Sequence, residues 1–137
     1  MSLFTGGYFH FQPESAGVGA SPGFSFGRSG NVSSGAYLNN ESVPSNTTGR
    51  AIALSNARIT GVIVRNQNSN TFTVEVEEHD GSTFTSLGTF SVTSSRGDDF
   101  LGLNIPLTSD EELAVSISAG SCKNPVVIVF VKGDALG

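Results

Sequence analysis

Beyond Arg50 the chain consists of short segments in which apolar and polar residues alternate, and this pattern constrains the fold more than any other feature. The clearest segment is Thr71–His79, where apolar residues fall on one face of an extended strand and polar residues on the other. The apolar ones are Phe72, Val74 and Val76. In Arg58–Asn66 the same alternation puts Ile59, Gly61 and Ile63 on one face. No stretch shows the period of an amphipathic helix, so the sequence predicts an all-β protein.

Turn signals separate these segments along the chain. Asp80-Gly81 predicts a hairpin turn, and Leu87-Gly88 predicts a β-bulge in the returning strand. The polar stretches Asn66–Asn70 and Thr93–Asp99 are expected to form a turn and a loop. About six strands joined in this way are typical of an antiparallel β-sandwich or jelly roll.

Two C-terminal segments are expected to bury apolar side chains. In Phe100–Leu107 the inward residues are expected to be Leu101, Leu103, Ile105 and Leu107. Val126–Val131 (VVIVFV) is apolar on both faces, so it needs a second cover besides the core of its own domain. Because no helix is predicted, that cover is expected to be another copy of the chain. The expected contact residues are Val126, Ile128 and Phe130.

The N-terminal region has a different character. Between Met1 and Gly27 the only charged side chain is Glu14, yet the segment holds six aromatic residues: Phe4, Tyr8, Phe9, Phe11, Phe24 and Phe26. Such a segment is poorly suited to solution as a free tail and has too few aliphatic residues to form its own core. We therefore expect residues 1–50 to form an extended arm whose aromatics anchor it on another protein, and residues 51–137 to form the β-domain.

Charge and composition exclude several classes of partner. The net charge is −5 and the sequence pI is about 4.8, and the seven basic residues form no cluster. Nucleic acid and anionic membranes both require a basic footprint, so neither is expected as a partner. No segment has the length of a membrane span, and the N-terminus lacks the pattern of a signal peptide. Synthesis in the host cytoplasm is expected.

Residues suited to catalysis are scattered. Glu75, Glu77 and His79 share one face of a predicted strand and could bind a divalent cation, but the polar side of a sheet has the same pattern. No serine or cysteine occupies a nucleophile motif, and no glycine-rich phosphate loop is present. We expect no enzymatic activity, no cofactor and no metal site. Cys122 is the only cysteine, which excludes an intrachain disulfide, and it is expected to fill apolar space.

One tripeptide suggests a different function. Arg96-Gly97-Asp98 is the sequence that integrins recognise, and it falls in the predicted loop Thr93–Asp99. The same three residues also favour a tight turn. Adhesion therefore remains an alternative.

Four segments together resemble a known family: Arg58–Val62, Phe72–Val76, Leu113–Ser118 and Asn124–Val131. They are similar to the trimeric jelly-roll modules of tailed-bacteriophage head-decoration and head-fibre proteins, whose architecture is like that of tumour necrosis factor. The resemblance implies a homotrimer with the final apolar strand near the threefold axis. It also implies an N-terminal arm that anchors the trimer. The sequence has no coiled-coil or collagen-like stalk, which favours a short surface protein over a long fibre.

The expected function is that of a virion structural protein, a homotrimeric capsid decoration (cementing) protein bound to the major capsid protein or another virion protein at the capsid surface. A tail, collar or baseplate component is the first alternative, including a receptor-binding fibre tip with carbohydrate contacts in Asn66–Asn70 and Thr93–Asp99. A free carbohydrate-binding or adhesion module is the second.

Overall fold

The computed structural model describes residues 23–40, 51–52, 57–107 and 112–133. All regular structure in these ranges is β-strand. The strands are β1 (Gly23–Gly27), β2 (Asn31–Ser33), β3 (Asn39–Asn40), β4 (Ala51–Ile52), β5 (Ala57–His79), β6 (Phe84–Pro106), β7 (Glu112–Lys123) and β8 (Val126–Gly133). The all-β prediction is confirmed.

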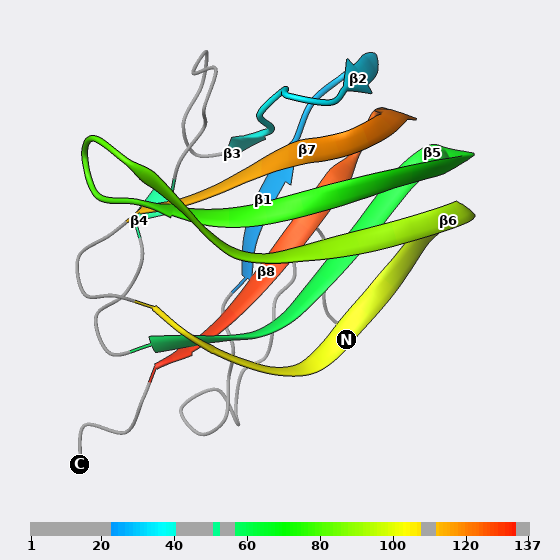
Figure 1. Cartoon of the computed structure of the whole chain (residues 1–137). Helices are drawn as coiled ribbons and strands as arrows, with labels where there is room; N and C mark the ends of the chain where they lie inside the picture. The colour runs from blue at the N-terminus through cyan, green and yellow to red at the C-terminus, as the bar shows by residue number, and fades with distance from the viewer. Residues whose placement is uncertain (1–22, 41–50, 53–56, 108–111, 134–137) are drawn as a thin grey trace, which may run out of the picture.

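The strands form one curled antiparallel sheet. Its order is β2-β7-β5-β8-β1-β3, with β4 paired to β7 and β6 paired to β5. Strands β5 and β6 are 23 residues long each and bend in their middle, so they run through both halves of the sheet (Figure 1). The first part of β5 pairs with β8, and the last part pairs with β7. The result is a sandwich-like fold whose two halves share β5 and β6.

The β5–β6 hairpin follows the sequence prediction. Gly81 has a φ of 104°, which a glycine adopts without strain, and the Asp80 carboxylate accepts hydrogen bonds from the backbone N–H groups of Ser82 (2.9 Å) and Thr83 (2.8 Å). The predicted bulge is also present, because Val76 pairs with Gly88 while the next residue, Glu77, pairs with Ser86. Local turn chemistry therefore fixes this part of the fold.

The predicted turn Asn66–Asn70 and loop Thr93–Asp99 are wrong. Both stretches lie inside strands, at the bends of β5 and β6. The pairing register between the two strands shifts between Arg65 and Asn70 and again between Asn70 and Phe72. Each polar stretch thus interrupts the ladder without ending the strand, and the bulged residues provide the bend.

The boundary of the expected arm is also different. Residues 23–40 contribute β1, β2 and β3 to the sheet, and β1 pairs along its whole length with β8. Phe26 is fully buried in the core, so it is not available to bind a capsid, and Phe24 is partly buried against that core. The other four expected anchors, Phe4, Tyr8, Phe9 and Phe11, lie outside the described residues.

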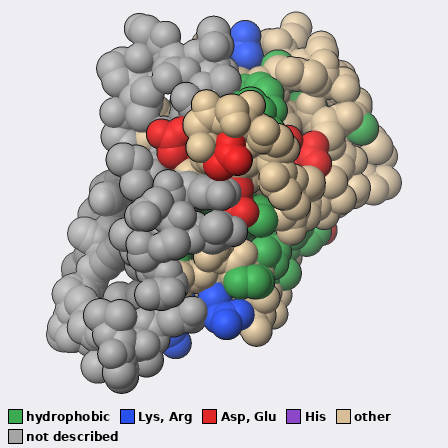
Figure 2. Space-filling model, turned by 60° about the vertical axis from the view of Figure 1, so that its left-hand side comes forward, with side chains coloured by type: hydrophobic (Ala, Val, Ile, Leu, Met, Phe, Trp, Pro, Cys, Tyr) green, Lys and Arg blue, Asp and Glu red, His purple; other side chains and the backbone are tan. Residues whose placement is uncertain are grey.

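The core lies between the two halves of the sheet. It is formed by buried residues of β1, β2, β5, β6, β7 and β8, among them Phe26, Phe72, Ile117 and Val129. Cys122 joins this core at 3% exposure, as expected, and burial raises the pKa of its thiol to about 11. Figure 2 shows one side of the molecule, where apolar side chains reach the surface between acidic side chains above and basic side chains below.

Candidate assembly surface

Strand β8 has two apolar faces with different surroundings. Val127, Val129 and Val131 are completely buried in the core. The residues that alternate with these valines point the other way. Val126 is 39% exposed, and Ile128 and Phe130 are partly exposed. The three residues expected at a contact between copies therefore share one outward face.

Neighbouring strands extend this surface. Ile63 of β5 pairs with Ile128, and Gly61 of β5 pairs with both Phe130 of β8 and Leu101 of β6. We call the resulting surface the outward apolar face; it consists of Ile63, Leu101, Val126, Ile128 and Phe130. It covers three adjacent strands of the curled sheet.

Two glycines keep this face flat. A Cβ atom at Gly23 would lie 3.0 Å from Cγ2 of Ile128 and 3.3 Å from Cε1 of Phe130. A Cβ atom at Gly61 would lie 3.1 Å from Cδ2 of Leu101 and 3.7 Å from Cδ2 of Phe130. The large side chains occupy the space above both glycines, where other residues would place their own side chains. They therefore lie close to the sheet and to one another.

Leu101 was expected to point inward, and this prediction is wrong. Leu101 is 63% exposed, whereas Leu103 and Ile105 pack against the core. Gly102, which lies between Leu101 and Leu103, has a φ of 70°. This left-handed residue breaks the alternation of the strand, so Leu101 turns to the outside.

A similar irregularity affects β5. Ile59 was expected on the same face as Gly61 and Ile63, but it is completely buried. Ile59 pairs with Val131 of β8 and Gly61 pairs with the next residue, Phe130, so Thr60 is an extra residue in β5 relative to β8. Relative to β6 the shift has the opposite sense, because Ile59 pairs with Ile105 and Gly61 with Leu101, so the extra residues lie in β6. The alternation read from the sequence cannot show such an insertion.

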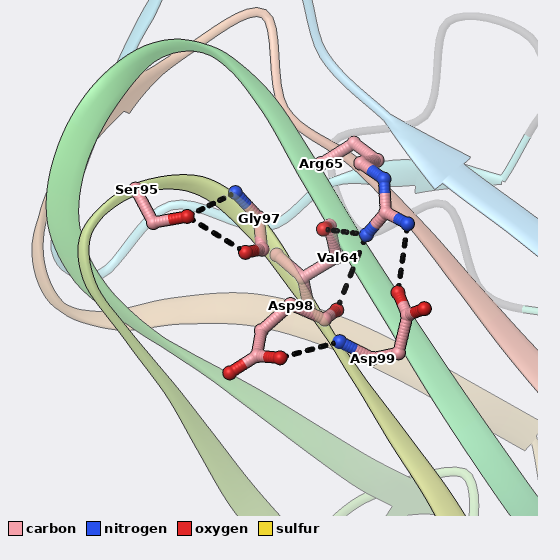
Figure 3. A network of polar contacts seen from close by, with 6 residues as sticks. All are labelled: Val64, Arg65, Ser95, Gly97, Asp98 and Asp99. Carbon is pink, nitrogen blue, oxygen red and sulfur yellow. Dashed lines mark hydrogen bonds and ion pairs between the residues drawn. The ribbon is translucent and has the colours of Figure 1, made fainter.

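A polar network borders the outward apolar face at the bend of β6 (Figure 3). The guanidinium of Arg65 forms an ion pair of 2.7 Å with Asp99 and donates hydrogen bonds to the backbone carbonyls of Val64 (2.8 Å) and Asp98 (3.3 Å). The Asp98 carboxylate accepts the backbone N–H of Asp99 at 2.8 Å. Since the ion-paired side chains are about half exposed, the pair contributes at most about 1 kcal/mol. The contacts of Arg65 link β5 to β6 at this bend.

The tripeptide Arg96-Gly97-Asp98 lies in this network. Gly97 pairs with Arg65 of β5, and a Cβ atom at Gly97 would clash with the carbonyl of Val64. The side chains of Arg96 and Asp98 are exposed at a shallow hollow. The tripeptide is therefore held by strand pairing and is not the free loop that the sequence suggested.

Glu75 and Glu77 lie on the outward side of β5 in the other half of the sheet, where they alternate with the buried valines of that strand. Burial and hydrogen bonding to Glu77 raise the pKa of Tyr37 to about 12, and burial also raises the pKa of Glu77. Nδ1 of His79 accepts the backbone N–H of Gly81 at 3.1 Å and lies 3.8 Å from the Glu112 carboxylate. Among the described residues, no group of three or more His, Cys, Asp or Glu side chains is arranged to hold a metal ion.

Comparisons with protein-family models and with curated proteins found no match for this chain. Within the described residues there is also no helix long and apolar enough to cross a membrane. The features of this chain that bear on its function are therefore the outward apolar face and the sequence of the N-terminal region.

Proposed function

We propose that this chain is a virion structural protein, a homotrimeric capsid decoration protein of a tailed phage. The observation that supports this proposal is the outward apolar face. Its residues Leu101 and Val126 are the two large apolar side chains that stand most exposed among the described residues. Contiguous apolar surface of this kind marks sites of protein association. Identical copies packed on a common axis would cover it.

The N-terminal segment supplies the proposed anchor to the shell. With Phe24 and Phe26 assigned to the domain, the anchors are Phe4, Tyr8, Phe9 and Phe11. If each buried about 100 Å² of apolar area on docking, the four would contribute about 10 kcal/mol at about 25 cal/mol per Å². Ordering the segment would offset much of that gain. Three linked arms per trimer would therefore be needed for tight retention.

Deletion of residues 2–22 tests the anchor. The variant should form trimers that fail to bind capsids, because β1 begins at Gly23 and the sheet stays complete. A matched control replaces only Glu14 by Gln, which keeps every aromatic residue and should keep capsid binding. Capsid binding by the deletion variant would contradict the role of the segment.

Imaging of virus particles separates decoration from the alternatives. Density for the protein across the whole shell supports a decoration protein, and density confined to the tail supports a tail component. Absence from particles, with binding to glycans or cells by the purified chain, would support a free adhesion module. Strand pairing of Gly97 disfavours this last function, because the tripeptide is not presented on a flexible loop.

A further inference from the structure

Leu101 is exposed because of the backbone, and this distinguishes it from an ordinary surface leucine. The left-handed Gly102 turns it outward, and the missing side chain at Gly61 leaves room for it to lean toward Phe130. Replacing either glycine would disturb this placement. An isolated exposed leucine needs no explanation. Here, however, the backbone conformation of Gly102 and the absence of a side chain at Gly61 both determine where the Leu101 side chain lies.

The edge of the sheet next to Leu101 is poorly suited to pairing with another chain. Among the described strands, β6 pairs with β5 alone, which makes it an edge strand of this part of the sheet. Ser94 (φ 47°) and Gly102 (φ 70°) interrupt its extended backbone, and Pro106 removes a hydrogen-bond donor. Such devices protect natural edge strands against edge-to-edge association. A partner that binds in this region is therefore expected to pack on the face of the sheet and not to add a strand at its edge.

The charges that border the face are compatible with an identical partner. Arg65 and Asp99 neutralise each other within one copy, at 2.7 Å. Arg96 and Asp98, which are exposed beside this pair, also carry opposite charges, so the charges of the border sum to zero and its basic and acidic groups can pair with those of a second copy. A strongly charged partner would find no net charge at this border to pair with.

We propose that Leu101 is the anchor of the contact between copies of this chain. In the assembled protein the Leu101 side chain of one copy packs on Ile128 and Phe130 of the next copy, over the flat surface above Gly23 and Gly61. This inference rests on the self-assembly proposed above and names its central contact. Burial of an apolar side chain at the centre of an interface, inside a polar border, is the usual arrangement of a strong contact.

Cysteine cross-linking tests the contact directly. In one copy, β5 lies between Leu101 on β6 and Ile128 on β8, so their Cα atoms are about 10 Å apart or more, too far for a disulfide. A Leu101→Cys/Ile128→Cys double variant of the full chain, oxidised in solution, should therefore form disulfides only between copies. The native Cys122 is buried and should not interfere. The control is Thr93→Cys/Ile128→Cys, which places the first cysteine at another exposed position of β6.

We expect covalently linked oligomers from the first variant and none from the control. In sedimentation experiments, Leu101→Asp should weaken self-association at least about tenfold, whereas Thr93→Asp should not. If wild-type protein is an oligomer but Leu101→Cys/Ile128→Cys gives no cross-link, the contact at Leu101 is refuted and the proposed function stands. If the wild-type chain is monomeric at every concentration and absent from particles, both are refuted.

Discussion

Replacement of Phe26 by alanine tests whether β1 belongs to the folded domain. The side chain is 0% exposed, and its strand pairs with β8 from Gly23 to Gly27. Removing a fully buried phenylalanine from a packed core lowers the free energy of unfolding by about 3–5 kcal/mol. For a domain of this size the melting temperature should fall by about 10–25 °C. An arm residue at the same position would change neither quantity.

Urea unfolding followed by far-UV circular dichroism is a suitable assay, since the chain has no tryptophan. The midpoint should fall while the slope of the transition stays the same. Phe24→Ala is the matched control on the same strand, and its effect should be smaller because Phe24 is only partly buried. A loss below about 1 kcal/mol for Phe26→Ala would show that β1 lies outside the cooperative unit.

Three further changes give separate tests. Burial raises the pKa of Glu77, so the folded state binds the proton of this carboxyl group more tightly than the unfolded state does. The stability gained in this way should be lost as pH rises through the raised pKa. Unfolding curves measured at several pH values should show a weaker pH dependence of stability for Glu77→Gln. Gly120→Ala should lower the free energy of unfolding by about 1–3 kcal/mol, because Gly120 has a φ of 73° and a Cβ atom there would lie 2.9 Å from Cα of Phe72; an unchanged melting temperature would contradict this geometry. Cys122 should react with a thiol reagent at pH 8 only after unfolding, since burial raises its pKa to about 11; rapid labelling of the folded protein would contradict its position in the core.

The sequence predicted what depends on neighbouring residues. Alternation from Thr71 to Glu77, the turn at Asp80-Gly81 and the bulge at Leu87 all follow from local periodicity and turn chemistry, and the structure confirms them. His79, which was expected on the polar face of this strand, is buried. Because both faces of Val126–Val131 are apolar, the sequence also predicted apolar side chains on the outward face of β8, and the structure places Val126, Ile128 and Phe130 there. These features need no knowledge of distant strands.

What the sequence did not predict depends on distant pairing or on single irregular residues. Phe26 was assigned to an arm because its partner Val127 is far along the chain, so no local pattern identifies β1 as a core strand. Leu101 was placed inward because alternation ignores the left-handed Gly102. Register shifts of one residue reverse the face of every following side chain, and their positions are set by tertiary contacts.

The place of β8 between β5 and β1 has a consequence for how the protein is made. On the ribosome, β1 emerges early, but the strand it must pair with is the last to be synthesised among those described. Until then the nascent chain exposes Phe26 without its partner, and the sheet cannot close. The fold can therefore be completed only after β8 has left the ribosome, and chains released before β8 is made should be targets for chaperones or proteases.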